Sequence, residues 1–169
     1  TYGTTTGQTG HFANKIMQKK GLPFAAYFSV KMPDTWTPTF DLSNLQKVRR
    51  INLNAEQEID FAIKKIQSRS AGDYMRNKVP TILAKTFYGL DYNAMRKTSH
   101  FKVENSCIGC GLCAKNCPVS AIEIRNKKPV WVKDRCVMCL SCLHHCPKFA
   151  IQYENRTKKH GQYTNPNVK

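Results

Sequence analysis

The sequence lacks cysteine throughout residues 1–106, and its eight cysteines all lie between Cys107 and Cys146. Secreted disulfide-rich domains usually distribute their bridges through the whole fold. This clustering therefore favours metal ligands over disulfides, and it predicts a reducing compartment such as the cytoplasm.

Acidic residues and long apolar runs are also scarce. The chain has 11 Asp and Glu against 27 Lys and Arg, a formal net charge of +16. No stretch approaches the roughly 20 apolar residues of a membrane span. The positive charge is dispersed and accompanies no RNA- or DNA-binding motif, so it does not indicate a nucleic-acid partner. We expect it to steer the protein toward acidic redox partner proteins or an anionic cofactor.

Residues 1–70 have the pattern of an α/β segment. Apolar residues recur at helical spacing over residues 12–17, and Gly21 marks the end of that helix. The apolar run 24–30 predicts a strand buried on both faces, as in a parallel sheet. Asn54 is expected to cap a second helix. Because a parallel sheet needs more strands than this segment supplies, and the chain opens without an initiator Met, we expect the start of a domain to be missing.

The remaining chain divides by composition into three parts. Residues 71–100 are expected to form a connector with a short amphipathic helix after Pro80. Residues 101–153 contain every cysteine, and residues 154–169 form a polar, basic tail that we expect to be loose.

The cysteine-rich part contains an internal repeat with an offset of 29 residues, each copy reading C-x2-C-x2-C-x3-C-P. The first copy runs from Cys107 to Pro118 and the second from Cys136 to Pro147. Three thiolates within seven residues allow one loop to hold three irons of a cubane, so a fourth ligand must come from elsewhere in the chain. Zinc sites more often use C-x2-C pairs separated by longer spacers.

On these motifs, residues 101–153 closely resemble the bacterial dicluster ferredoxins. The resemblance implies two 4Fe-4S clusters, with the last cysteine of each run crossing to the other cluster. The ligands of cluster 1 are then Cys107, Cys110, Cys113 and Cys146, and those of cluster 2 are Cys136, Cys139, Cys142 and Cys117. The expected fold is a ferredoxin-like α+β module of two small hairpins and two short helices.

Other side chains of this module are expected to support it. Trp131 and Tyr153 fall on predicted strands and should pack in the small core. His144 and His145 adjoin Cys146, but all eight ligand positions are filled, so we expect them at the surface or beside the ligands. Trp36 is expected to pack over a domain edge, with flavin contact as the alternative.

A second resemblance concerns the whole chain. It rests on the opening Thr1-Tyr2-Gly3, on Lys19-Lys20-Gly21 and on the run Phe28-Ser29-Val30-Lys31-Met32-Pro33. These features are similar to the C-terminal part of EFR-type flavodoxin–ferredoxin fusions. That resemblance implies a partial flavodoxin-like segment before the ferredoxin module, with Tyr2, Gly3 and Thr4 in a loop beside a flavin ring. A competing alignment makes residues 4–9 a phosphate-binding loop. Either way, half of the flavin site is missing, and FMN is expected only in a longer chain.

The sequence thus predicts electron transfer through two 4Fe-4S clusters, linked to a flavin in the intact protein. One alternative is a flavin-dependent oxidoreductase whose clusters relay electrons. Another is a zinc-stabilised interaction module. We identify no independent catalytic residues, because the thiolates serve as ligands rather than nucleophiles.

Overall fold

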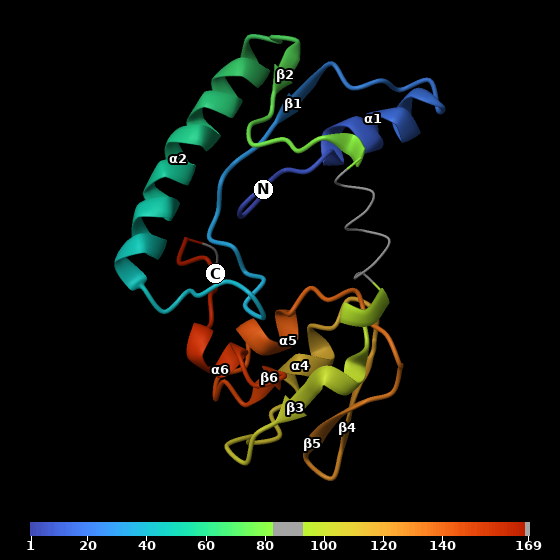
Figure 1. Cartoon of the computed structure of the whole chain (residues 1–169), viewed down its shortest axis with the longest axis vertical. Coiled ribbons are helices and arrows are strands. Elements are labelled where there is room, and N and C mark those ends of the chain that lie inside the picture. Colours follow the sequence, from blue (N-terminus) through green and yellow to red (C-terminus); the bar gives the residue numbers. More distant parts are fainter. Residues whose placement is uncertain (83–92, 168–169) are drawn as a thin grey trace. The chain divides into compact units, whose positions relative to one another are not determined.

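The structure is a computed structural model that describes residues 1–82 and 93–167, and it divides into two compact units (Figure 1). The described part of the first unit comprises residues 1–34 and 44–82, and that of the second comprises residues 35–43 and 93–167. The sequence analysis placed residues 35–43 in the first segment, whereas the structure places them in the second unit. Within the described ranges, no helix is long and apolar enough to cross a membrane.

The first unit contains two helices and a small parallel sheet. Helix α1 (Thr9–Gln18) is followed by Gly21 at φ 72°, as expected from the sequence. Strand β1 (Ala26–Phe28) pairs in parallel with β2 (Gly72–Tyr74). Residues 72–74 had been expected in the connector, because Gly and Asp give little strand signal.

The second helix of this unit, α2 (Leu45–Gln67), begins earlier than expected. Its cap is Asn44, whose side chain accepts a hydrogen bond from the amide of Lys47 at 2.9 Å. The prediction that Asn54 caps the helix was wrong, since Asn54 lies in the helix interior. The connector helix expected after Pro80 falls largely outside the described residues.

Apolar side chains of the first unit remain largely uncovered. Helix α1 contains no buried residue, and Ala55 is the buried residue of α2. The exposed large apolar residues of the two helices are Phe12, Ile16, Leu45, Leu53, Ile59, Phe61, Ile63 and Ile66. Parallel sheets are normally covered on both faces, so this unit exposes surface that such a fold ordinarily buries.

The second unit contains two antiparallel strand pairs. Strand β3 (Phe101–Val103) pairs with β6 (Ile151–Tyr153), and β4 (Ile122–Arg125) pairs with β5 (Lys128–Trp131). The β4–β5 pair is a hairpin whose two turn residues both have positive φ, which suits a type I′ turn. Two hairpins had been expected. The β3–β6 pair is instead formed by strands from opposite ends of the module.

Two short helices and a 3-10 turn complete the scaffold. Helix α4 (Leu112–Lys115) follows the first cysteine loop, and α5 (Ser141–His144) follows the second. The turn η1 (Thr98–His100) leads directly into β3. The elements expected for a ferredoxin-like α+β module are therefore present.

An aromatic cluster forms the core beside β3 and β6. The ring of Trp131 stacks on Phe101 at 4.9 Å, and Tyr153 contacts Phe101 edge-on at 5.2 Å. Trp36 packs against Tyr153 at 6.2 Å between ring centroids. Leu143 and Ile151 complete the buried centre. The packing roles expected for Trp131 and Tyr153 are confirmed, and Trp36 packs against this core rather than over a domain edge.

The segment after β6 is held to the module rather than loose. Helix α6 (Thr157–His160) begins with a fully buried threonine. The hydroxyl of Thr157 accepts a hydrogen bond from the amide of Tyr153 at 2.9 Å and donates one to Oε1 of Gln152 at 2.7 Å. Further along, Nε2 of Gln162 donates to the carbonyl oxygen of Cys146 at 2.9 Å. Part of the tail therefore belongs to the folded unit.

Candidate metal centre

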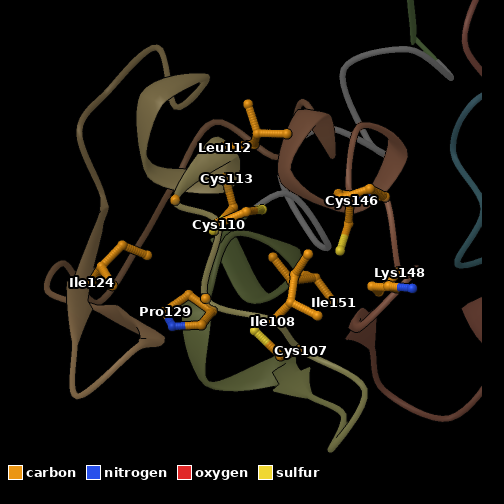
Figure 2. A pocket seen from close by; sticks show the side chains of 13 residues that line it. Cys107, Ile108, Cys110, Leu112, Cys113, Ile124, Pro129, Cys146, Lys148 and Ile151 are labelled. Atoms are coloured by element: carbon orange, nitrogen blue, oxygen red, sulfur yellow. The ribbon is translucent and has the colours of Figure 1, made fainter.

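The eight cysteines line two separate pockets in the second unit. Cys107, Cys110 and Cys113 come from the loop leading into α4, and they share the first pocket with Cys146, which follows α5 (Figure 2). Apart from these thiols, the lining is mostly apolar and includes Ile108, Leu112, Ile124, Pro129 and Ile151. Three thiols thus arrive on one loop and a fourth arrives from the other copy of the repeat.

The second pocket also contains four cysteines, with the roles of the two loops exchanged. Cys136, Cys139 and Cys142 come from the second loop, and Cys117 comes from the end of the first. The aromatic pair Phe101 and Trp131 forms part of its lining. Each pocket therefore receives three cysteines from one run and the last cysteine of the other.

The two loops have the same backbone shape but different residues. Gly109 and Gly111 have φ of 67° and 77°, and the residues 29 positions later, Met138 and Leu140, have φ of 53° and 54°. Non-glycine residues in the left-handed region cost roughly 1 kcal/mol or more each. The second loop therefore keeps a strained backbone, and Leu140 is nevertheless fixed there by its burial in the core.

Backbone amides point at the sulfur atoms of the two crossing cysteines. The amide of Ala121 donates to Sγ of Cys117, and the amide of Ala150 donates to Sγ of Cys146, each at 3.2 Å. Such hydrogen bonds stabilise the negatively charged thiolate over the thiol. The sequence analysis did not assign this role to the two alanines, although they occupy equivalent positions in the repeat.

The buried cysteines are poor acids without a metal. Burial raises the pKa of Cys142 to about 12, and burial also raises the pKa of Cys113 and of Cys136. An iron ion compensates for this cost, because a coordinating thiol loses its proton to the metal. We therefore expect metal binding at these pockets to release protons.

The chemistry and shape of the pockets fit thiolate-bound clusters. Each pocket presents four sulfur donors within an apolar lining. The loop at Gly109 is held so closely against the β4–β5 turn that a Cβ would lie 2.6 Å from the carbonyl oxygen of Lys127. Among the described residues, no three His, Cys, Asp or Glu side chains converge closely enough to hold a single metal ion.

The two histidines beside Cys146 differ from each other. His144 is buried; its Nε2 donates to the carbonyl oxygen of Thr35 at 2.9 Å, and its Nδ1 accepts from the amide of Tyr163 at 3.2 Å. Burial lowers the pKa of His144, which favours this neutral form. The surface alternative was wrong for His144, because it is buried and bonded to Thr35 and Tyr163. His145 is exposed and contacts the carbonyl oxygen of Ser141.

The candidate flavin residues make hydrogen bonds and close contacts within the first unit. The amide of Tyr2 donates to the carbonyl oxygen of Val30 at 3.0 Å, and the hydroxyl of Thr4 donates to Asp34 at 2.9 Å. A Cβ at Gly3 would lie 2.3 Å from the carboxyl group of Asp34. Tyr2 lines a pocket of about 410 Å³, whereas Gly3 and Thr4 are not part of its lining.

In the alternative phosphate loop, residues 4–9, threonine hydroxyl groups already donate hydrogen bonds to backbone carbonyl oxygens. The hydroxyl groups of Thr5 and Thr6 donate to the carbonyl oxygens of Asn77 and Arg76 at 2.6 and 2.8 Å. The hydroxyl of Thr9 donates to the carbonyl oxygen of Thr6. A phosphate group would have to displace these contacts in order to use the hydroxyls.

Two comparisons with known proteins concern the cysteine-rich part. Residues 106–151 match the family described as 4Fe-4S dicluster domain. A stretch of 23 residues is 61% identical to Ferredoxin-1 of Rhodospirillum rubrum, covering 14% of this chain and 42% of that protein. The chain thus spans less than half the length of this curated relative. Together, these similarities and the geometry support an iron–sulfur module of the ferredoxin type in residues 106–151.

Proposed function

We propose that the second unit carries electrons one at a time through two 4Fe-4S clusters with crossed cysteine ligands. Cluster 1 would be held by Cys107, Cys110, Cys113 and Cys146, and cluster 2 by Cys136, Cys139, Cys142 and Cys117. The observation that carries this proposal is the division of the eight cysteines between two pockets, three from one run and one from the other.

The protein's own residues support such a role in three ways. The thiolates hold the cluster, and a bound cluster supplies a one-electron couple whose potential depends on charge, hydrogen bonds and solvent exposure. The amides of Ala121 and Ala150 stabilise charge on the sulfur atoms they contact. The apolar lining limits the access of water to both pockets. Each contribution favours repeated electron exchange without breakage of ligand bonds.

We further propose that the first unit links the clusters to a flavin in a longer chain. The two-stranded parallel sheet and the uncovered apolar residues of α1 and α2 support this proposal, because additional α/β elements would bury them. Tyr2, Gly3 and Thr4 remain the proposed loop beside the flavin ring. In that protein the flavin would exchange electrons in pairs and the clusters would exchange them singly.

Anaerobic analysis of iron, sulfide and zinc tests the cluster proposal. We expect about eight iron atoms and about eight sulfides per chain, the content of two 4Fe-4S clusters. Reduction with dithionite should bleach the broad visible absorbance and produce an electron paramagnetic resonance signal. Stoichiometric zinc without sulfide would overturn the proposal in favour of a zinc-stabilised module.

Flavin analysis of the longer chain separates an electron carrier from an enzyme. Bound FMN with turnover of a small substrate would support the flavin-dependent oxidoreductase. Exchange of electrons with redox proteins in the absence of such turnover would support a carrier. Acidic redox proteins in a reducing compartment such as the cytoplasm are the partners we propose. A longer chain purified without FMN, which also fails to take it up, would contradict the flavin link.

A further inference from the structure

The two cysteine pockets differ in the charge of the side chains that line them. Lys148 lines the first pocket and is the charged residue among its lining side chains. The lining of the second pocket contains no Lys, Arg, Asp or Glu among the described residues. Cations also lie beside the second pocket without lining it: Arg96 donates to the carbonyl oxygen of Cys136, and Lys133 donates to that of Val119.

Apolar side chains surround the first pocket at the surface. Ile108 is 59% exposed, and Leu112 and Ile124 are each 38% exposed. Figure 2 shows these side chains around Cys110, a cysteine that is itself exposed. An exposed apolar group over a redox centre provides the dry contact that short-range electron transfer requires, and protein interfaces commonly have such an apolar centre.

Lysines border this apolar group. Lys127 is exposed in the turn of the β4–β5 hairpin, and its backbone and Cβ lie against the loop at Gly109. Lys148 is exposed and lines the first pocket. Within the described ranges, neither lysine forms an ion pair. The nearby carboxylate of Glu123 is instead paired with Arg125 at 2.9 Å. The border is consequently positive and available to an external carboxylate.

We propose that this surface docks an acidic redox protein at the first pocket. The surface consists of Ile108, Leu112 and Ile124 with a border of Lys127 and Lys148. Its partner would bring a small apolar contact surrounded by carboxylates. The argument is charge complementarity. Lys127 and Lys148 make no ion pair within the described ranges, whereas Arg96 and Lys133 beside the second pocket donate to backbone carbonyl oxygens. The proposal rests on the proposed electron transfer, because docking at a cluster has a purpose only if electrons cross there.

Calorimetric binding to two haem proteins of opposite charge tests the surface. The probes are the acidic cytochrome b5 and the basic cytochrome c, each titrated into the cluster-loaded protein. We expect the acidic probe to bind, and its affinity should fall as salt rises from about 20 to about 300 mM, because salt screens the attraction between opposite surface charges. The double variant Lys127→Glu/Lys148→Glu should weaken this binding at least roughly tenfold, because the border then repels carboxylates.

A matched control variant separates local docking from net charge. Lys102→Glu/Lys159→Glu makes the same change in charge at exposed positions that line neither pocket. It should retain most of the affinity for the acidic probe. Equal weakening by both double variants, tighter binding of the basic probe, or no binding of the acidic probe by fully loaded protein would overturn the docking surface. Iron and sulfide contents are measured on the same samples. Missing clusters would contradict the electron-transfer proposal, whereas full clusters without binding of the acidic probe would contradict the docking surface alone.

Discussion

The backbone at Gly109 lies directly against the carbonyl oxygen of Lys127, so the first cysteine loop rests on the tip of the β4–β5 hairpin. The contact leaves no room for a side chain at residue 109. It joins the loop that holds three cysteines to a hairpin formed by residues 122–131.

Gly109→Ala should therefore damage the first pocket. The new Cβ would lie 2.6 Å from the carbonyl oxygen, and the residue would keep a φ of 67°. We expect roughly 1 kcal/mol from the backbone and roughly 1–3 kcal/mol from overpacking. The measurement is the anaerobic melting temperature together with iron content. Gly111→Ala is the matched control, because its φ is 77° but its Cβ would meet its nearest atom at 3.9 Å. Equal losses in both variants would contradict the contact's importance.

Serine variants of the two crossing cysteines should have reciprocal effects. If the ligands cross, Cys117→Ser should impair the cluster of the Cys136–Cys142 loop, and Cys146→Ser should impair that of the Cys107–Cys113 loop. Iron should fall from about eight to about four atoms per chain in each case. Electron paramagnetic resonance of the reduced variants identifies which signal is lost. Loss of the cluster in the variant's own loop would refute crossing.

Removal of iron should unfold the module selectively. Its buried apolar core is small, and cluster ligation would supply much of its stability. Anaerobic chelation should abolish the hydrogen-exchange protection of β3 and β6. Helix α2, in the first unit, is the internal reference and should exchange as before. Retained protection of β3 and β6 after complete iron loss would show that the polypeptide alone maintains the fold.

The two clusters should have unequal potentials. Lys148 lines the first pocket, and its positive charge favours the more negative, reduced state. Lys148→Gln should lower one of two midpoints by on the order of 20–40 mV, which corresponds to roughly 0.5–1 kcal/mol for a one-electron couple. A spectroscopic redox titration provides both midpoints. A single common midpoint, or an equal shift of both, would contradict the asymmetry.

Thr157→Val should loosen the segment that follows β6. Valine has a similar shape but leaves the buried amide of Tyr153 without its hydroxyl acceptor. We expect a loss of about 1–3 kcal/mol, measured as a lower anaerobic melting temperature. Thr157→Ser keeps the hydroxyl and should lose less. A larger loss in the serine variant would indicate that the methyl group, rather than the hydrogen bond, fixes α6.

Local sequence signals predicted the cysteine-rich module well. The repeat predicted two short helices, which the structure has after Gly111 and Leu140, and alternating apolar residues placed the strands. These features depend on neighbours within a few residues, so they can be recognised without the fold. Helix α1 and the glycine after it were predicted for the same reason.

Features that depend on distant residues could not be predicted in this way. The pairing of β3 with β6 joins residues far apart in the chain, so it was mistaken for a hairpin. The short strand β2 forms because β1 is available beside it, not because residues 72–74 favour a strand. The burial of His144 depends on Thr35 and Tyr163, neither of which adjoins it in sequence.

The strand order of the second unit also has a consequence for biosynthesis. The β4–β5 hairpin uses residues 122–131 alone, so it can form as soon as they leave the ribosome. The β3–β6 ladder must wait until translation has passed Tyr153. During that interval Phe101 lacks the strand with which it pairs. A chaperone that binds exposed aromatic segments could bind it during that time.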